Sequence, residues 1–157
     1  MIGALVCLLL QSQQPLFTIA RSTNANLVQY DARVLSSGAL DPKQPVVAYW
    51  IMLAQDGRHA ELTGTEKRMA YGFTLMPDIR GCYRMTLAAD KSRPLRVCAN
   101  SGSARVEMDI AGHHSLLQRM FISTRRVGLF GKAVNFIELF GEDNESGDRR
   151  YEKILPK

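Results

Sequence analysis

Short runs in which apolar and polar residues alternate recur along most of this chain. The clearest is residues 104–110, in which the polar residues Arg105, Glu107 and Asp109 alternate with apolar ones, and residues 27–34 follow the same pattern. Because successive side chains of a strand point to opposite faces, each run predicts a β-strand with one face on the core.

The predicted strands follow one another with short turns between them. Residues 46–53 are apolar on both faces, which predicts a strand covered on both sides. The pattern predicts an all-β fold, an antiparallel barrel or a strongly curved sheet or sandwich of about eight to ten short strands. The remaining predicted strands are residues 16–21, 82–88, 95–100, 116–126, 133–141 and 149–155.

One short helix is predicted in the sequence LTGTEKRMAYGF. Thr63 and Glu66 have the spacing of a capping box, and Gly72 stands where a C-terminal cap glycine with a positive φ is expected. Two turns fit between these signals. We expect this helix to pack at one end of the sheet and to cover an opening there.

The N-terminal segment resembles an export signal. Residues 2–10 are apolar and uncharged and are too few to span a bilayer, so residues 1–14 are predicted to be a signal peptide and 15–157 a single β-rich domain. Cleavage is expected near Ser12–Gln14, giving a mature chain that starts between Gln13 and Leu16. No Lys or Arg precedes the apolar run, and a buried N-terminal strand is the alternative interpretation. The localisation predicted is the periplasm or envelope of a bacterium.

Removal of the leader would also remove Cys7 and leave two cysteines, Cys82 and Cys98. An even count in an exported chain indicates a disulfide. Both cysteines lie on the polar face of their predicted strands, and their midpoint is Asp90, inside the turn ADKSRP. A hairpin centred there brings the two cysteines opposite each other, so we predict that they are bonded.

The charge balance is basic, with a net charge of +5 and a pI near 9.3. The basic residues are scattered and are not interleaved with aromatic residues, so no nucleic-acid partner is expected. The expected partner is a small ligand or an anionic component of the envelope. No cofactor or metal is predicted, because His59, His113 and His114 lack partners with ligand spacing and are interpreted as exposed turn residues.

No catalytic motif is recognised, and the candidate site residues are therefore ligand-binding ones. Tyr49 and Trp50 lie on opposite faces of one strand, so one of them faces inward whichever face that is. Packing is the alternative role for both aromatics, and turn formation or surface ion pairing for the polar candidates. The polar candidates are Arg21, Asn24, Asn26, Glu66, Arg68 and Tyr71.

Several stretches in order resemble a bacterial secreted family catalogued as domain of unknown function 4833. They are LFTIARSTNANLVQYDARV, VVAYWIM, ELTGTEKRMAYGF, NFIELFGED and YEKILP, which together span residues 16–156. The resemblance implies an exported β-rich protein of one domain and brings no catalytic residues.

From these features we expect a non-catalytic binding protein of the cell envelope, since a small barrel can hold one ligand. The alternatives are a structural or interaction module of an envelope assembly and a hydrolase without a recognisable motif.

Overall fold

The computed structural model describes residues 11–157. Its eleven strands form one sheet, as the alternating sequence pattern predicts. The strands are β1 (Ser12–Arg21), β2 (Asn24–Val34), β3 (Val46–Ile51), β4 (His59–Glu61), β5 (Phe73–Pro77), β6 (Tyr83–Leu87), β7 (Leu95–Asn100), β8 (Ser103–Ile110), β9 (His113–Val127), β10 (Gly131–Asp143) and β11 (Arg149–Ile154).

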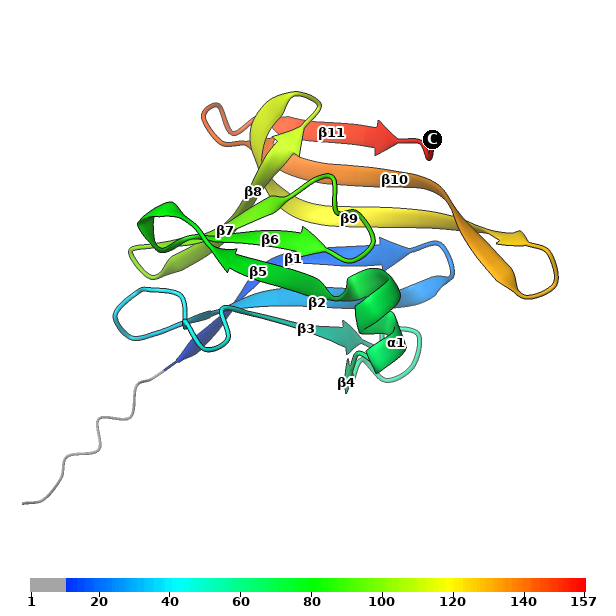
Figure 1. The fold of residues 1–157 in the computed structure, drawn as a ribbon, viewed down its shortest axis with the longest axis horizontal. Helices are drawn as coiled ribbons and strands as arrows, with labels where there is room; N and C mark the ends of the chain where they lie inside the picture. The colour runs from blue at the N-terminus through cyan, green and yellow to red at the C-terminus, as the bar shows by residue number, and fades with distance from the viewer. Residues whose placement is uncertain (1–10) are drawn as a thin grey trace, which may run out of the picture.

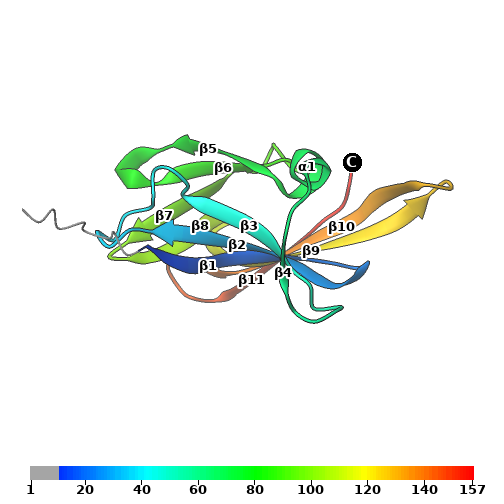
Figure 2. The same ribbon diagram turned by 90° about the horizontal axis from the view of Figure 1, so that it is seen from below.

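Nine of the strands follow one path, in the order β4-β3-β2-β1-β9-β8-β7-β6-β5. The long strand β9 pairs with β8 through its first residues and then, in parallel, with β1, while its other side carries β10 and then β11. The path curls into a half-barrel in which β5 and β6 lie across from β1, β2 and β3 (Figures 1 and 2). The predicted curved all-β fold is therefore confirmed.

The concave side of the half-barrel holds the hydrophobic core. Phe17 and Tyr30 are 2% and 0% exposed, and their rings stack with centroids 4.4 Å apart. The Tyr30 hydroxyl donates a hydrogen bond of 2.7 Å to the backbone carbonyl of Tyr71, which satisfies the one polar atom of this ring. This bond ties β2 to the helical segment on the opposite side of the curl.

The predicted helix is present, with a different end from the one expected. Gly64–Glu66 form α1, and Lys67–Tyr71 continue as one π-helical turn, η1. The capping box is confirmed, since Thr63 and Glu66 each bond the other's backbone N–H. The prediction that Gly72 has a positive φ is wrong.

Gly72 has an extended backbone, with φ −70° and ψ 167°. A Cβ at this position would collide with the backbone carbonyl of Lys67. The widened π turn brings that carbonyl against Gly72, so the glycine is required by close approach rather than by a left-handed backbone.

The disulfide is present between Cys82 and Cys98, whose Cα atoms are 4.4 Å apart. The register of the β6–β7 hairpin pairs Tyr83 with Val97 and Met85 with Leu95, which centres the hairpin on Asp90 as predicted. A short 3-10 turn, η2 (Ile79–Gly81), leads into Cys82. A disulfide is compatible with an exported protein.

Two sequence-based expectations are wrong in detail, and two short strands were missed. The strand at 46–53 ends at Ile51, and its residues 47–49 and 51 are only partly buried, so the strand is not covered on both faces. The histidines His113 and His114 begin β9, since Ala111 and Gly112 alone make the turn. The short edge strands β4 and β5 were not anticipated.

The structure does not test the leader prediction, and residues 1–10, with Cys7, lie outside the described residues. β1 begins at Ser12, within the segment predicted to be removed. Gln13 donates a hydrogen bond of 2.8 Å to Asp31, and Gln14 accepts one of 2.8 Å from the backbone N–H of Ala104. A cut after residue 14 would therefore remove contacts that hold the start of β1.

Candidate binding cleft

A cleft of about 600 Å³ runs along the side of β3 that β4 leaves uncovered. We call it the β3 cleft. One wall consists of β3 with the neighbouring part of β2, and the other consists of η1 and the start of β5, which lie across the opening of the curled sheet (Figure 2). Its lining residues are Gln13, Arg33, Gln44, Val46, Val47, Ala48, Tyr49, Glu61, Leu62, Lys67, Arg68, Tyr71, Gly72 and Phe73.

Positive charge dominates the lining of the β3 cleft. Arg33 stands on the β2 side and Lys67 and Arg68 on the helical side, against the single carboxylate of Glu61. No ion pair among residues 11–157 involves any of these three basic side chains. The cleft therefore presents cations from two walls to whatever enters it, and the apolar residues between them offer contact area.

A second group of side chains meets the cleft at Tyr71, and we call it the Arg21 cluster: Arg21, Asn24, Trp50, Glu66 and Tyr71. The Arg21 guanidinium carbon lies 4.4 Å from the centroid of the Trp50 ring and 5.9 Å from that of Tyr71. Arg21 also donates to the Tyr71 hydroxyl at 3.3 Å and to the Asn24 side-chain oxygen at 3.4 Å. The cation is thus held between aromatic rings, a favourable arrangement for Arg.

Glu66 connects this cluster to the helix cap. Its carboxylate accepts hydrogen bonds from the Trp50 indole at 3.2 Å and from the Thr63 backbone N–H at 2.8 Å. Burial acts to raise the pKa of Glu66, but these hydrogen bonds and the nearby charge of Arg21 outweigh it, so the net pKa is lowered. Glu66 therefore stays ionised at neutral pH and fixes the helix against β3.

Tyr49 lies on the opposite face of β3, as its position next to Trp50 predicts. Its hydroxyl donates a 2.7 Å hydrogen bond to Asp31, which also accepts from Gln13 and from Gln29 at 2.8 Å each. Burial, together with the hydrogen bond to Asp31 and its negative charge, raises the pKa of Tyr49 to about 12. Tyr49 is therefore a neutral, oriented aromatic in the cleft wall and does not act as a base.

Most of the residues predicted from sequence gather at this end of the molecule. Five form the Arg21 cluster, Tyr49 and Arg68 line the cleft, and Tyr71 belongs to both groups. Asn26 stands apart, because its side-chain oxygen accepts from the backbone N–H of Ala54 and so holds a turn. The turn role considered for Asn24 also holds, since it accepts from the backbone N–H of Asn26.

Sequence reasoning missed five charged or polar residues of the cleft: Gln13, Arg33, Gln44, Glu61 and Lys67. The alternating pattern of residues 27–34 places Arg33 on the polar face of its strand. That face of β2 becomes part of the cleft wall only because β3 and β1 pack beside it. Lys67 could have been found, because it is next to Arg68 in the same short helix.

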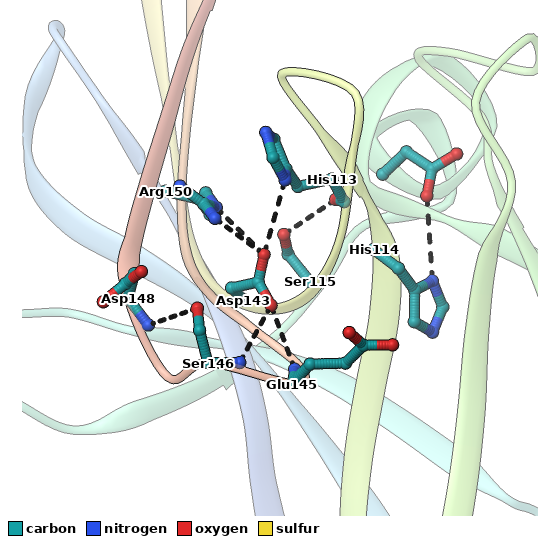
Figure 3. A network of polar contacts seen from close by, with 9 residues as sticks. His113, His114, Ser115, Asp143, Glu145, Ser146, Asp148 and Arg150 are labelled. Atoms are coloured by element: carbon teal, nitrogen blue, oxygen red, sulfur yellow. Dashed lines mark hydrogen bonds and ion pairs between the residues drawn. The ribbon is translucent and has the colours of Figure 1, made fainter.

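A separate polar network lies at the start of β9, where β10 ends and β11 begins (Figure 3). Asp143 accepts from Arg150 at 2.8 Å and from the backbone N–H groups of Glu145 and Ser146, and lies 3.5 Å from Nδ1 of His113. The bond from Arg150, with those from the backbone, holds the pKa of Asp143 well below its usual range. His114 faces two other carboxylates, Glu107 at 3.3 Å and Asp109 at 3.7 Å.

The network contains Ser, His and Asp side chains without the geometry of a hydrolytic triad. The Ser115 hydroxyl is fully buried and donates at 2.8 Å to the backbone carbonyl of His113, not to a ring nitrogen (Figure 3). An activated nucleophile requires a base within hydrogen-bond reach of its hydroxyl. We therefore interpret this network as an anchor for the strand ends and place the candidate site at the β3 cleft.

The fold and the cleft define a class: a curled β-sheet protein with a cationic, partly apolar cleft at its open edge. The family model described as domain of unknown function DUF4833 matches residues 17–153. The chain therefore belongs to this family, as the resemblance of its motifs implies. Comparison with curated proteins and with solved structures found no match. Within residues 11–157, no helix has the length and apolar character needed to cross a bilayer.

Proposed function

We propose that this protein is a non-catalytic binding protein of the bacterial cell envelope and that the β3 cleft takes an anionic ligand with an apolar part. The observation that carries the proposal is the set of three basic side chains, Arg33, Lys67 and Arg68, on the two walls of one cleft. The cleft volume of about 600 Å³ lies in the range of small-molecule sites. Tyr49, Val47 and Phe73 supply apolar contact between the charges.

The Arg21 cluster supports this role by fixing the helical wall. Lys67 and Arg68 follow Glu66 directly, and Glu66 is bonded to Trp50 on the opposite wall. The two walls are therefore connected before a ligand enters, which lowers the entropic cost of binding.

A matched pair of fluorescent probes tests the proposal. Anilinonaphthalene sulfonate combines an apolar ring system with one negative charge, and N-phenylnaphthylamine has the same rings without the sulfonate. We expect the sulfonate to bind the purified protein more tightly than the neutral amine. The Lys67→Gln, Arg68→Gln double variant should weaken sulfonate binding by about tenfold, which corresponds to a loss of about 1.4 kcal/mol for the two exposed cations together, and should leave amine binding unchanged.

The matched control is Arg149→Gln combined with Lys157→Gln, which removes two exposed charges outside the cleft. It should leave both affinities unchanged. Equal affinity for the two probes, or equal loss in the two double variants, would contradict a cationic binding cleft.

The envelope part of the proposal rests on the disulfide and on the apolar run of residues 2–10, which we expect to belong to a leader. The side chains of Gln11, Gln13 and Gln14 bond to Asp41, Asp31 and Gly102 respectively, which favours a mature chain that retains Gln11. N-terminal sequencing of the protein from its native host should give a start no later than Gln11. An intact Met1 in a cytoplasmic fraction would contradict export.

A further inference from the structure

The β9–β10 hairpin projects beyond the rest of the sheet and carries apolar residues at its tip (Figure 1). Leu129 is 89% exposed and Phe130 is 99% exposed, the two highest values among the exposed large hydrophobic residues. Val127, at the end of β9, is 46% exposed. Single exposed apolar residues are common, but two adjacent ones at the most protruding point of a molecule mark an interaction site.

Two glycines build the turn that presents these residues. Gly128 has a φ of +65°, which a residue with a side chain rarely adopts, and a Cβ on Gly131 would come 2.6 Å from the backbone carbonyl of Val127. Leu129 and Phe130 therefore sit between two positions that only glycine fills without strain. The tip is a defined three-residue turn that directs apolar side chains to solvent.

Basic residues surround the tip without compensating acids. Arg126 and Lys132 are direct cross-strand partners, and Arg125 is paired with Ala133. Like charges directly opposite each other destabilise a strand pair, so an anion bound between these two cations would relieve their repulsion. Residues 122–137 contain no Asp or Glu, and no ion pair within residues 11–157 involves these three cations.

A hollow of about 220 Å³ lies at the base of the tip, next to the turn between β1 and β2. The backbone N–H of Ser22 donates to the carbonyl of Ile122 at 3.0 Å, and the Ser22 hydroxyl accepts from the backbone N–H of Thr124 at 3.0 Å. The hollow thus joins basic side chains with hydroxyl groups in a fixed place. It is lined by Ser22, Thr23, Thr124, Arg125, Arg126 and Lys132.

We propose that the tip of the β9–β10 hairpin docks on the surface of a bilayer that contains anionic phospholipid. Leu129 and Phe130 enter the boundary between headgroups and acyl chains, while Arg125, Arg126 and Lys132 bind headgroup phosphates. The order of the side chains fits a bilayer, with apolar residues at the apex and cations just behind them. This surface is distinct from the β3 cleft, and the inference does not depend on the proposed function.

A second copy of the chain fits this tip poorly. Two tips that meet would bring their uncompensated cations together, and the few exposed apolar side chains fall far short of the roughly 1,200 Å² that a stable interface buries. Charge complementarity therefore selects an anionic surface as the partner.

Co-sedimentation with vesicles tests the proposal. The purified protein should bind vesicles of phosphatidylcholine with phosphatidylglycerol, should bind vesicles of phosphatidylcholine alone at least about tenfold more weakly, and should dissociate at high salt. The Phe130→Ser variant should lose about tenfold in affinity for the anionic vesicles, and Arg126→Gln combined with Lys132→Gln should lose at least as much.

Matched control variants remove an exposed apolar side chain or two positive charges outside the tip. Leu155→Ser replaces another exposed apolar residue, which is 67% exposed after β11, and Arg149→Gln with Lys157→Gln removes two other charges. Both should bind like the wild type. Equal binding to neutral and anionic vesicles, no binding to either, or equal losses in the control and tip variants would overturn the proposal.

Fluorescence quenching by brominated phospholipid gives a second, independent readout. The protein has a single tryptophan, Trp50, which is 6% exposed and should not be quenched. The Phe130→Trp variant should show additional emission that brominated anionic vesicles quench. If the additional emission of the vesicle-bound Phe130→Trp variant were not quenched, the tip would not enter the bilayer and the assigned geometry would be overturned.

Discussion

The β3 cleft and the hairpin tip are both basic and both carry aromatic residues, but they differ in shape and support. In the Arg21 cluster, which meets the cleft at Tyr71, the aromatic Trp50 is 6% exposed and is held by Arg21, Tyr71 and Glu66, whereas at the tip Phe130 is 99% exposed. The cleft is concave and continuous with the core, and the tip is convex and projects from it. The same two residue types therefore suit a small ligand in one place and an extended surface in the other.

The largest expected difference concerns stability. Trp50→Ala should lower the free energy of unfolding by about 3 to 5 kcal/mol, because it removes a buried ring and leaves Arg21 and Glu66 without their partner. Phe130→Ala should change it by less than about 0.5 kcal/mol, because that ring contacts mainly solvent. Urea unfolding of the two variants checks this contrast, and similar losses would show that the tip is packed in solution.

Loss of the disulfide should affect binding at the cleft more than binding at the tip. Replacing Cys82 and Cys98 by serine should cost about 3 kcal/mol, given the 16-residue separation that the bond closes. The bond fixes the β6–β7 hairpin, and β5, which carries Phe73 of the cleft wall, pairs only with β6. Binding of the sulfonate probe should therefore weaken while vesicle binding is retained, and the opposite pattern would contradict this assignment.

A smaller effect is expected at the helix cap. Thr63→Ala removes the hydrogen bond that the Thr63 hydroxyl accepts from the Glu66 backbone N–H, at 3.2 Å, and should cost about 1 kcal/mol in urea unfolding. Sulfonate binding should weaken with it, because Lys67 and Arg68 follow the cap. An unchanged stability would mean that the capping box does not contribute.

The smallest expected effect is a dependence on pH. Because the pKa of Glu66 is lower in the folded than in the unfolded protein, its ionised form stabilises the fold at neutral pH. That contribution, less than about 1 kcal/mol for a partly exposed group, is lost as the pH falls through the lowered folded-state pKa. Urea unfolding should therefore lose less stability on acidification in Glu66→Gln than in the wild type.

The features that could be predicted from sequence are local ones. The pairing of Cys82 with Cys98 could be predicted because both lie on the same face of two strands, at equal distances from one turn. The capping box could be predicted from the spacing of Thr63 and Glu66. The parallel pairing of Thr18 with Arg119 joins segments about a hundred residues apart and leaves no trace in local periodicity.

The open side of β3 also could not be predicted, because it depends on long-range pairing. A run that is apolar on both faces indicates cover on both sides, but it does not report that the next strand pairs only from Tyr49 onward. Similarly, residues 127–132 fall between two predicted strands, but the exposure of Leu129 and Phe130 depends on how far β9 and β10 extend beyond their neighbours.

The most direct test measures both binding activities in both charge variants. Sulfonate affinity and anionic-vesicle affinity are determined for the wild type, for Lys67→Gln with Arg68→Gln, and for Arg126→Gln with Lys132→Gln. The first variant should lose about tenfold in sulfonate affinity and keep vesicle binding, and the second should show the reverse. If either variant weakened both activities equally, the two surfaces would not have separate partners and the account would be contradicted.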